Sequence, residues 1–166
     1  MDASVAARAT RERFYNAGGK MMLPIDLHVI AERMGVEVSD ATLEPDVAGF
    51  LVKDSGEAGA RAYINKDDWP QRQRFTLAHE LGHLVRHNET HGRDAEVGLV
   101  EYRAELSSLG SDQTEIWCNA FAAELLMPEA VIYKYWAKGY TAEQLRNLFD
   151  VSKAAMANRL NNLGLV

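Results

Sequence analysis

The segment His79-Glu80-Leu81-Gly82-His83 constrains this chain more than any other feature of its sequence. Residues four apart lie on one face of an α-helix, about 6 Å apart along the axis and roughly 40° apart around it. In this arrangement both imidazoles can bind one tetrahedral ion, at about 2.0–2.1 Å from each nitrogen. The spacing therefore predicts a helix through this segment, with a metal-binding face.

Glu80 and the apolar residues around the motif fit the same helix. Glu80 lies about 100° around the helix from His79, so its carboxylate can reach a water beside the metal without being a ligand. We predict that Glu80 is the general base. The histidines project away from the apolar arc that should be buried, which favours a metal site over a pair of core histidines. That arc contains Leu77, Ala78, Leu81, Leu84 and Val85.

The third metal ligand is not fixed by the motif. A catalytic zinc site takes three protein ligands and leaves one position for water. A further histidine ten residues after the first would indicate a metzincin, but that position is Glu89. His87 continues the same helical face, yet three ligands in line along one helix cannot surround an ion. Glu115 and Glu124 on a later predicted helix are better candidates, about 180° apart around it, and geometry alone gives Glu115 a modest preference.

The periodicity of the first half predicts an α+β domain. Two helices precede a pair of strands whose connection has the composition of a hairpin loop, and these strands make a small antiparallel sheet. The expected helices are 3–17 and 25–34, the paired strands are 47–53 and 61–65 around the loop 54–59, and a further short strand is expected at 36–38.

The helix that carries the motif has a clear start signal. Asp67-Asp68 stands just before Pro70. Carboxylates cap helix N-termini and proline favours the first turn, so this order predicts the start of a helix. We expect this helix to end near His87. The polar stretch 88–113 that follows is longer than the roughly 12–15 residues usual for an unstructured connection. It is either a functional lid or contains a short element around 97–106.

The last part of the chain is predicted to be helical throughout. One helix is expected at 114–127, closed by Pro128, and another at 128–138. A short helical pair then follows, because Thr141 with Gln144 forms a capping box and Ser152 precedes a second helical run. The turn at 149–152 between these two helices makes the tail similar to a helix-turn-helix.

Composition excludes several classes of protein. The net charge of −6 and pI near 5.4 lack the basic footprint of general phosphate-backbone binding. Cys118 is the sole cysteine, so no internal disulfide can form, as suits a reducing compartment. Residues 1–14 are charged without an apolar run, and no segment reaches the roughly 18 apolar residues of a membrane span. We therefore expect a cytoplasmic protein.

Two sequence blocks resemble the ImmA/IrrE family of metallopeptidases. The first is RFTLAHELGH, which ends at His83, and the second is EIWCNAFAAELLMP, which begins at Glu115. Together they are far more specific than the zinc motif alone, and the resemblance covers about residues 25–164. In that family the glutamate that opens the second block is the third ligand. The resemblance thus implies one zinc ion per chain, held by His79, His83 and Glu115.

The resemblance also implies a fold. It indicates a zincin-like, more narrowly gluzincin-like, metallopeptidase domain at residues 1–138, followed by a helix-turn-helix-like helical pair at 139–166 packed on it. The chain departs from the family pattern in the long 88–113 connection and in Cys118, which stands where alanine is common. A lone helical cysteine is usually a small core residue, and we expect this of Cys118.

The function that the resemblance implies is regulatory proteolysis. It points to a zinc-dependent endopeptidase that cuts a protein, namely a helix-turn-helix transcriptional repressor, in a stress response or on a mobile element. Two alternatives stay open: a zinc-containing partner-binding module, such as a toxin–antitoxin component, and a DNA-binding regulator that uses residues 141–166. The charged side chains of that tail sum to only +1, which favours a docked helical pair over DNA binding.

Substrate contacts are the least determined part of the site. The developing oxyanion needs a hydrogen-bond donor, and none of the able side chains is favoured by its spacing. By analogy with other zinc peptidases, the 61–65 strand is a candidate edge strand for pairing with an extended substrate. The able donors are Tyr63, Arg74, His91 and Tyr102.

Overall fold

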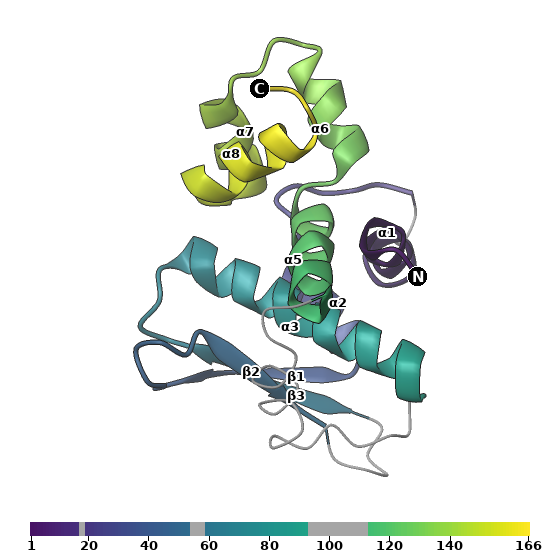
Figure 1. Ribbon diagram of the computed structural model, residues 1–166, viewed down its shortest axis with the longest axis vertical. Coiled ribbons are helices and arrows are strands. Elements are labelled where there is room, and N and C mark those ends of the chain that lie inside the picture. Colours follow the sequence, from purple (N-terminus) through teal and green to yellow (C-terminus); the bar gives the residue numbers. More distant parts are fainter. Residues whose placement is uncertain (17–18, 54–58, 93–112) are drawn as a thin grey trace.

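A computed structural model describes residues 1–16, 19–53, 59–92 and 113–166. Within these residues the chain forms helices that lie on one side of a small sheet, with α3 next to the sheet and α6, α7 and α8 farthest from it (Figure 1). The helices are α1 (Ala3–Phe14), α2 (Leu27–Arg33), α3 (Pro70–His91), α5 (Gln113–Leu126), α6 (Glu129–Trp136), α7 (Ala142–Phe149) and α8 (Lys153–Asn162). The strands are β1 (Val36–Ala41), β2 (Gly49–Val52) and β3 (Ala60–Asn65).

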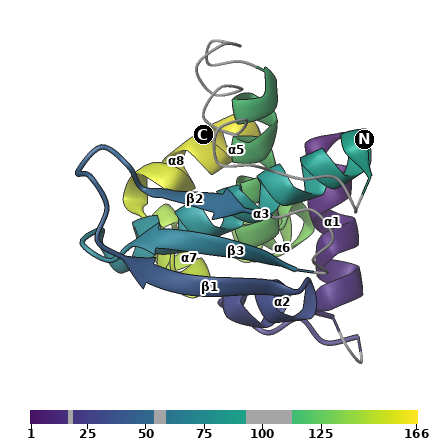
Figure 2. The same cartoon turned by 90° about the horizontal axis from the view of Figure 1, so that it is seen from below.

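The sheet is mixed, which corrects the expectation of a purely antiparallel one. Its strand order is β1-β3-β2, with β2 antiparallel and β1 parallel to the central β3. β1 is longer than the strand expected at 36–38, because its pairing with β3 continues to Ala41, which lies opposite Asn65. β1 thereby adds to the side of β3 that the β2–β3 pair leaves open. Figure 2 shows this order from the side of the sheet that faces away from α3.

Helix α3 starts at Pro70 as predicted, but not by the predicted cap. Its N-cap is Trp69, which makes no side-chain capping hydrogen bond, and Asp68 forms an ion pair at 3.1 Å with Arg72 instead. The helix ends at His91, one turn later than expected. The extra turn adds His91 to the histidines of this helix, at its C-terminal end.

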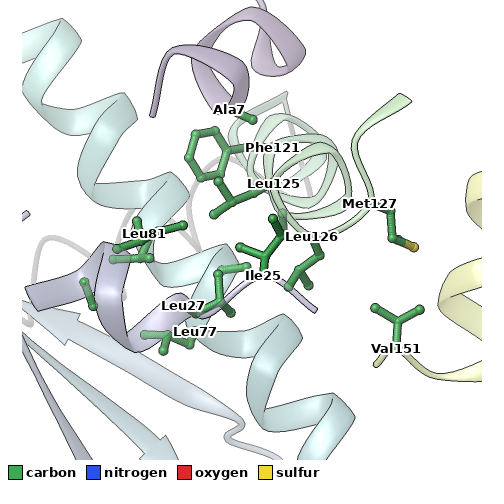
Figure 3. Close-up of a cluster of buried hydrophobic side chains, with 14 of the residues drawn as sticks. Ala7, Ile25, Leu27, Leu77, Leu81, Phe121, Leu125, Leu126, Met127 and Val151 are labelled. Atoms are coloured by element: carbon green, nitrogen blue, oxygen red, sulfur yellow. The ribbon is translucent and has the colours of Figure 1, made fainter. Parts of the chain in front are cut away.

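Helices α3 and α5 pack across each other on top of the sheet, and their contact contains the centre of the core (Figure 3). Gly82 allows the close approach: a Cβ at this position would lie 3.0 Å from Cδ1 of Phe121 and 3.5 Å from Cα of Cys118. Cys118 is fully buried, which confirms that it is a small core residue. The predicted apolar arc of α3 is buried as expected, except that Val85 is only partly so.

The C-terminal helices have the capping that the sequence predicts. Thr141 and Gln144 form a reciprocal capping box at α7, and the Ser152 hydroxyl accepts a hydrogen bond from the Ala155 amide at α8. Asp150 caps the end of α7 in a left-handed conformation. The turn contacts the start of α3, where Gln71 donates to the Asp150 carboxylate at 2.9 Å and Arg74 donates to the Asp150 carbonyl at 3.1 Å.

Other expectations differ from the structure only at their ends or lie outside it. Both ends of helices α1, α2, α5 and α6 lie within three residues of the predicted ends. The hairpin loop residues 54–58 and the proposed element at 97–106 lie outside the described residues. None of the helices in the described part of the chain combines the length and apolar character needed to span a bilayer.

Candidate metal centre

Three side chains converge where α3 crosses α5. His79 and His83 lie one turn apart on α3, and Glu115 projects from the first turn of α5. Their ligand-capable atoms all lie within 4.8 Å of one another. Because Gly82 sits between the histidines and lets α5 approach, the packing of the core and the assembly of this group depend on the same helix crossing. The structure therefore brings the three predicted ligands to one point.

The separations within this group are close to those of a tetrahedral metal site. Nε2 of His79 lies 3.2 Å from one oxygen of Glu115, and Nε2 of His83 lies 3.0 Å from the other. The two Nε2 atoms are 2.9 Å apart. Ligand atoms at about 2.0–2.1 Å from a tetrahedral zinc are about 3.3 Å from one another. Small side-chain adjustments would thus place all three atoms around one ion.

Glu115 supplies an independent observation in favour of a cation. Its Oε1 atom is buried and has no hydrogen-bond partner, although it lies 3.0 Å from Nε2 of His83. A buried, unsatisfied acceptor costs about 1–3 kcal/mol. A divalent cation would satisfy this oxygen together with both histidine nitrogens, so the donor set of two imidazoles and one carboxylate fits a metal such as zinc.

Asn119 fixes the orientation of His79. The amide oxygen of Asn119 lies 3.0 Å from Nδ1 of His79. Since an amide oxygen only accepts, Nδ1 carries the hydrogen and donates it, so Nε2 is the nitrogen of the neutral ring that can bind a metal. Asn119 follows Glu115 by four residues, so both lie on one face of α5. The sequence reasoning did not assign this role, although the spacing was a usable signal.

Glu80 is buried beside the group. Its side chain is 4% exposed, and its charge is one of the causes that raise the pKa of His79. It comes from α3 but is not among the three clustered ligand atoms. Glu80 is thus close enough to His79 to influence its charge, but it does not belong to the group of three.

The protonation states of the cluster follow from its contacts. Burial opposes the charge on His79, but the contact with Glu115 and the charges of Glu80 and Glu115 outweigh it, so the pKa of His79 is raised. The contacts with His79 and then His83 hold the pKa of the Glu115 carboxyl far below its usual range. Glu115 therefore remains a carboxylate, the form that binds metal, whereas His79 must lose a proton first.

Glu124, the other candidate ligand, has a different role. It is buried, and one oxygen forms an ion pair at 2.9 Å with Arg11 of α1, while the other pairs with Arg159 of α8 and accepts from the Glu129 amide at 3.2 Å. Arg159 also donates to the carbonyl of Met127 at 3.1 Å. Glu124 thus links four helices, and the sequence reasoning missed this network because its members are far apart in the chain.

The candidate oxyanion donors are mostly engaged elsewhere. Arg74 donates to the carbonyls of Ile25 and Asp150 at 3.1 Å each. Tyr63 alternates with the buried Ala62 and Ile64, so it points away from α3, and its ring stacks on Phe50 at 5.0 Å. His91 stacks on His87 at the end of α3. The fourth candidate, Tyr102, lies outside the described residues.

Two comparisons with known proteins show what this chain is similar to. A family model described as the IrrE N-terminal-like domain, peptidase family M78, matches residues 26–161. A 98-residue segment, 58% of this chain, is 42% identical to the radiation response metalloprotease IrrE of Deinococcus radiodurans. That segment spans 28% of the relative's length, so the similarity concerns one part of a longer protein.

Proposed function

Because this chain belongs to the ImmA/IrrE family of metallopeptidases, we propose that it is a zinc-dependent endopeptidase that hydrolyses a peptide bond in a protein substrate. The observation that carries the proposal is the convergence of His79, His83 and Glu115, with one buried Glu115 oxygen lacking any hydrogen bond. The buried Glu80 beside this group adds a proton acceptor. We further propose that the protein acts in the cytoplasm.

The chemistry divides between the metal and the chain. When bound by His79, His83 and Glu115, zinc supplies Lewis-acid chemistry that makes a water molecule acidic enough to lose a proton near neutral pH. Glu80 takes that proton on its carboxylate and later gives it to the nitrogen of the leaving amine, so it acts first as base and then as acid. Asn119 holds His79 in the tautomer that leaves Nε2 available.

An extended substrate would pair with β2 rather than with β3. β3 is central and pairs with a strand on each side, so the expected edge role of the 61–65 strand is wrong. β2 pairs only with β3 among the described strands, and a Cβ at Gly49 would lie 2.7 Å from Cγ2 of Thr76. Thr76 comes one turn before His79, so the open edge of β2 passes close to the metal group. Such an edge can accept a peptide strand.

The substrate that we propose is a helix-turn-helix transcriptional repressor, and the role is anti-repressor proteolysis in a stress response. Support comes from the family membership and from the similarity to the Deinococcus protein, which is a radiation response metalloprotease. The test is incubation of the purified chain with repressors encoded beside its gene, with products identified by mass spectrometry. A defined new pair of termini supports the proposal, and intact repressors in every condition would refute it.

The variant that isolates the chemistry is Glu80→Gln. General base catalysis contributes about 10²–10⁴-fold to a rate. We therefore expect the rate of cleavage to fall by a factor in this range while the metal is retained. The control is Glu89→Gln, on the same helix but ion-paired at 3.7 Å with the N-terminal amine, which should cleave normally. If Glu80→Gln keeps both its metal and its biological phenotype, the chain is a partner-binding module instead.

A further inference from the structure

Helix α3 carries more histidines than the proposed metal centre uses. His79, His83, His87 and His91 follow one another at intervals of four residues, so each lies one turn beyond the last. Among the described residues, the cluster that could hold a metal contains only the first two, with Glu115. His87 cannot complete that site, because ligands in line along one helix do not surround an ion. The second pair therefore requires its own explanation.

The second pair repeats the spacing of the first. The ring centroids of His87 and His91 are 4.7 Å apart, compared with 4.6 Å for His79 and His83. The rings of the second pair are more nearly parallel, at 27° against 68°. His87 is partly buried and His91 is exposed at the last residue of the helix. His91 is thus accessible from solvent, whereas the Nε2 atom of His87 is buried.

The position of the pair at the helix terminus favours a cation. The backbone dipoles of the 22-residue α3 place partial negative charge on its last turn, which contains both residues. The nearby cationic groups have other contacts: the N-terminal amine pairs with Glu89 at 3.7 Å, and the Arg86 guanidinium lies 5.2 Å from the centre of the Trp117 ring.

We propose that His87 and His91 form a second, weaker site for a divalent transition-metal ion of the zinc, nickel and copper class. Two imidazoles one turn apart can each offer one nitrogen, and imidazole is a ligand that these three ions share. Water completes the coordination, because the described residues offer no third ligand there. With one protein ligand fewer than the first site, the second binds its ion more weakly.

The test is a zinc titration of the full chain by equilibrium dialysis, with bound metal measured by elemental analysis. We expect wild type to hold one zinc per chain at low free zinc and a second at high free zinc. His91→Ala should lose only the second ion. His28→Ala is the matched control, because His28 is an exposed histidine on α2, and it should retain both.

Two further variants separate this site from the proposed catalytic one. Glu115→Ala should lose the tight ion and keep the weak one, so failure of the first site would not hide the second. His87→Ala should behave as His91→Ala does, with the far-ultraviolet circular dichroism of wild type. The proposal is wrong if wild type never exceeds one zinc, if His91→Ala keeps the second ion, or if His28→Ala loses it.

Discussion

Two glutamates on α5 lie nine residues apart and have opposite surroundings. The Glu115 side chain is 27% exposed, faces two histidines of α3, and has one oxygen without a hydrogen bond. The Glu124 side chain is 2% exposed and has both oxygens paired with arginines. A cation would satisfy the Glu115 oxygen that has no hydrogen bond. Both oxygens of Glu124 are already satisfied by partners within the protein.

This difference shows how one helix can serve both chemistry and stability. The Glu115 end of α5 meets α3 and provides the carboxylate of the proposed metal centre, while the other end joins α1, α6 and α8 through Glu124 and Arg159. Both arginines also bond to carbonyls near the end of α5, so their charge compensates the negative end of the helix dipole. The site is therefore held by a helix that is anchored at its far end.

The largest effect is expected from Glu124→Ala. Removing this carboxylate leaves Arg11 and Arg159 buried without their counter-charge, and breaking a buried pair in this way costs about 3–5 kcal/mol. Urea unfolding should show this loss in the free energy of unfolding, while the folded variant still binds metal. Glu143→Ala removes an exposed ion pair on α7 and is the control that should change stability little. Loss of metal by Glu124→Ala without loss of stability would reverse the assigned roles.

A smaller effect is expected from Asn119→Ala. Without the amide oxygen, His79 is no longer held in the tautomer that leaves Nε2 free, and loss of such a partner lowers metal affinity about 10–100-fold. Competition with a chelator of known affinity measures this change. Asn158→Ala, on the exposed side of α8, is the control. Unchanged affinity in Asn119→Ala would mean that the contact does not orient the metal ligand.

Metal binding should also depend on pH. The pKa of His79 is raised above its ordinary value of 6.5 in the metal-free protein, so its protonated form persists to a higher pH. Because the metal binds neutral imidazole, affinity should fall as pH falls through that raised pKa, by about tenfold per pH unit for each proton displaced. Metal affinity measured at a series of pH values checks this. A flat profile between pH 8 and 6 would contradict it.

The smallest effect is expected from Gly82→Ala. The added Cβ would lie 3.0 Å from the Phe121 ring, a contact that forces α3 and α5 apart by a few tenths of an ångström. Overpacking costs about 1–3 kcal/mol, but alanine recovers about 1 kcal/mol of helix propensity. We expect a modest loss of stability with weaker metal binding, measured by thermal unfolding with and without zinc. Equal effects in both conditions would show that this helix crossing does not position Glu115.

The sequence predicted the elements that local patterns encode. The capping box at Thr141, the cap at Ser152 and the helix through the histidine motif depend on residues within one or two turns, and all three are confirmed. The cap of α3 was predicted wrongly, because Asp68 has a competing partner, Arg72, one turn ahead. The parallel pairing of β1 was missed, since strand order depends on contacts between distant segments.

The candidate site divides in the same way. His79, Glu80 and His83 follow from helical spacing, but helical geometry alone gave Glu115 only a modest preference over Glu124. That choice depended on the family resemblance. The structure adds the physical reason why Glu124 does not join the histidines: its two oxygens form ion pairs with Arg11 and Arg159. Neither arginine is near Glu124 in the sequence. The orienting contact from Asn119 was not predicted, although Asn119 follows Glu115 by four residues on the same face of α5.

The most direct measurement is the zinc content of dialysed wild type beside Glu115→Ala and Glu124→Ala, by elemental analysis. We expect about one tightly bound zinc per chain in wild type and in folded Glu124→Ala, and none in Glu115→Ala, as the three-ligand site requires. A wild type that holds no zinc after dialysis, or a Glu115→Ala that holds as much as wild type, would contradict the metal centre and the peptidase function proposed from it.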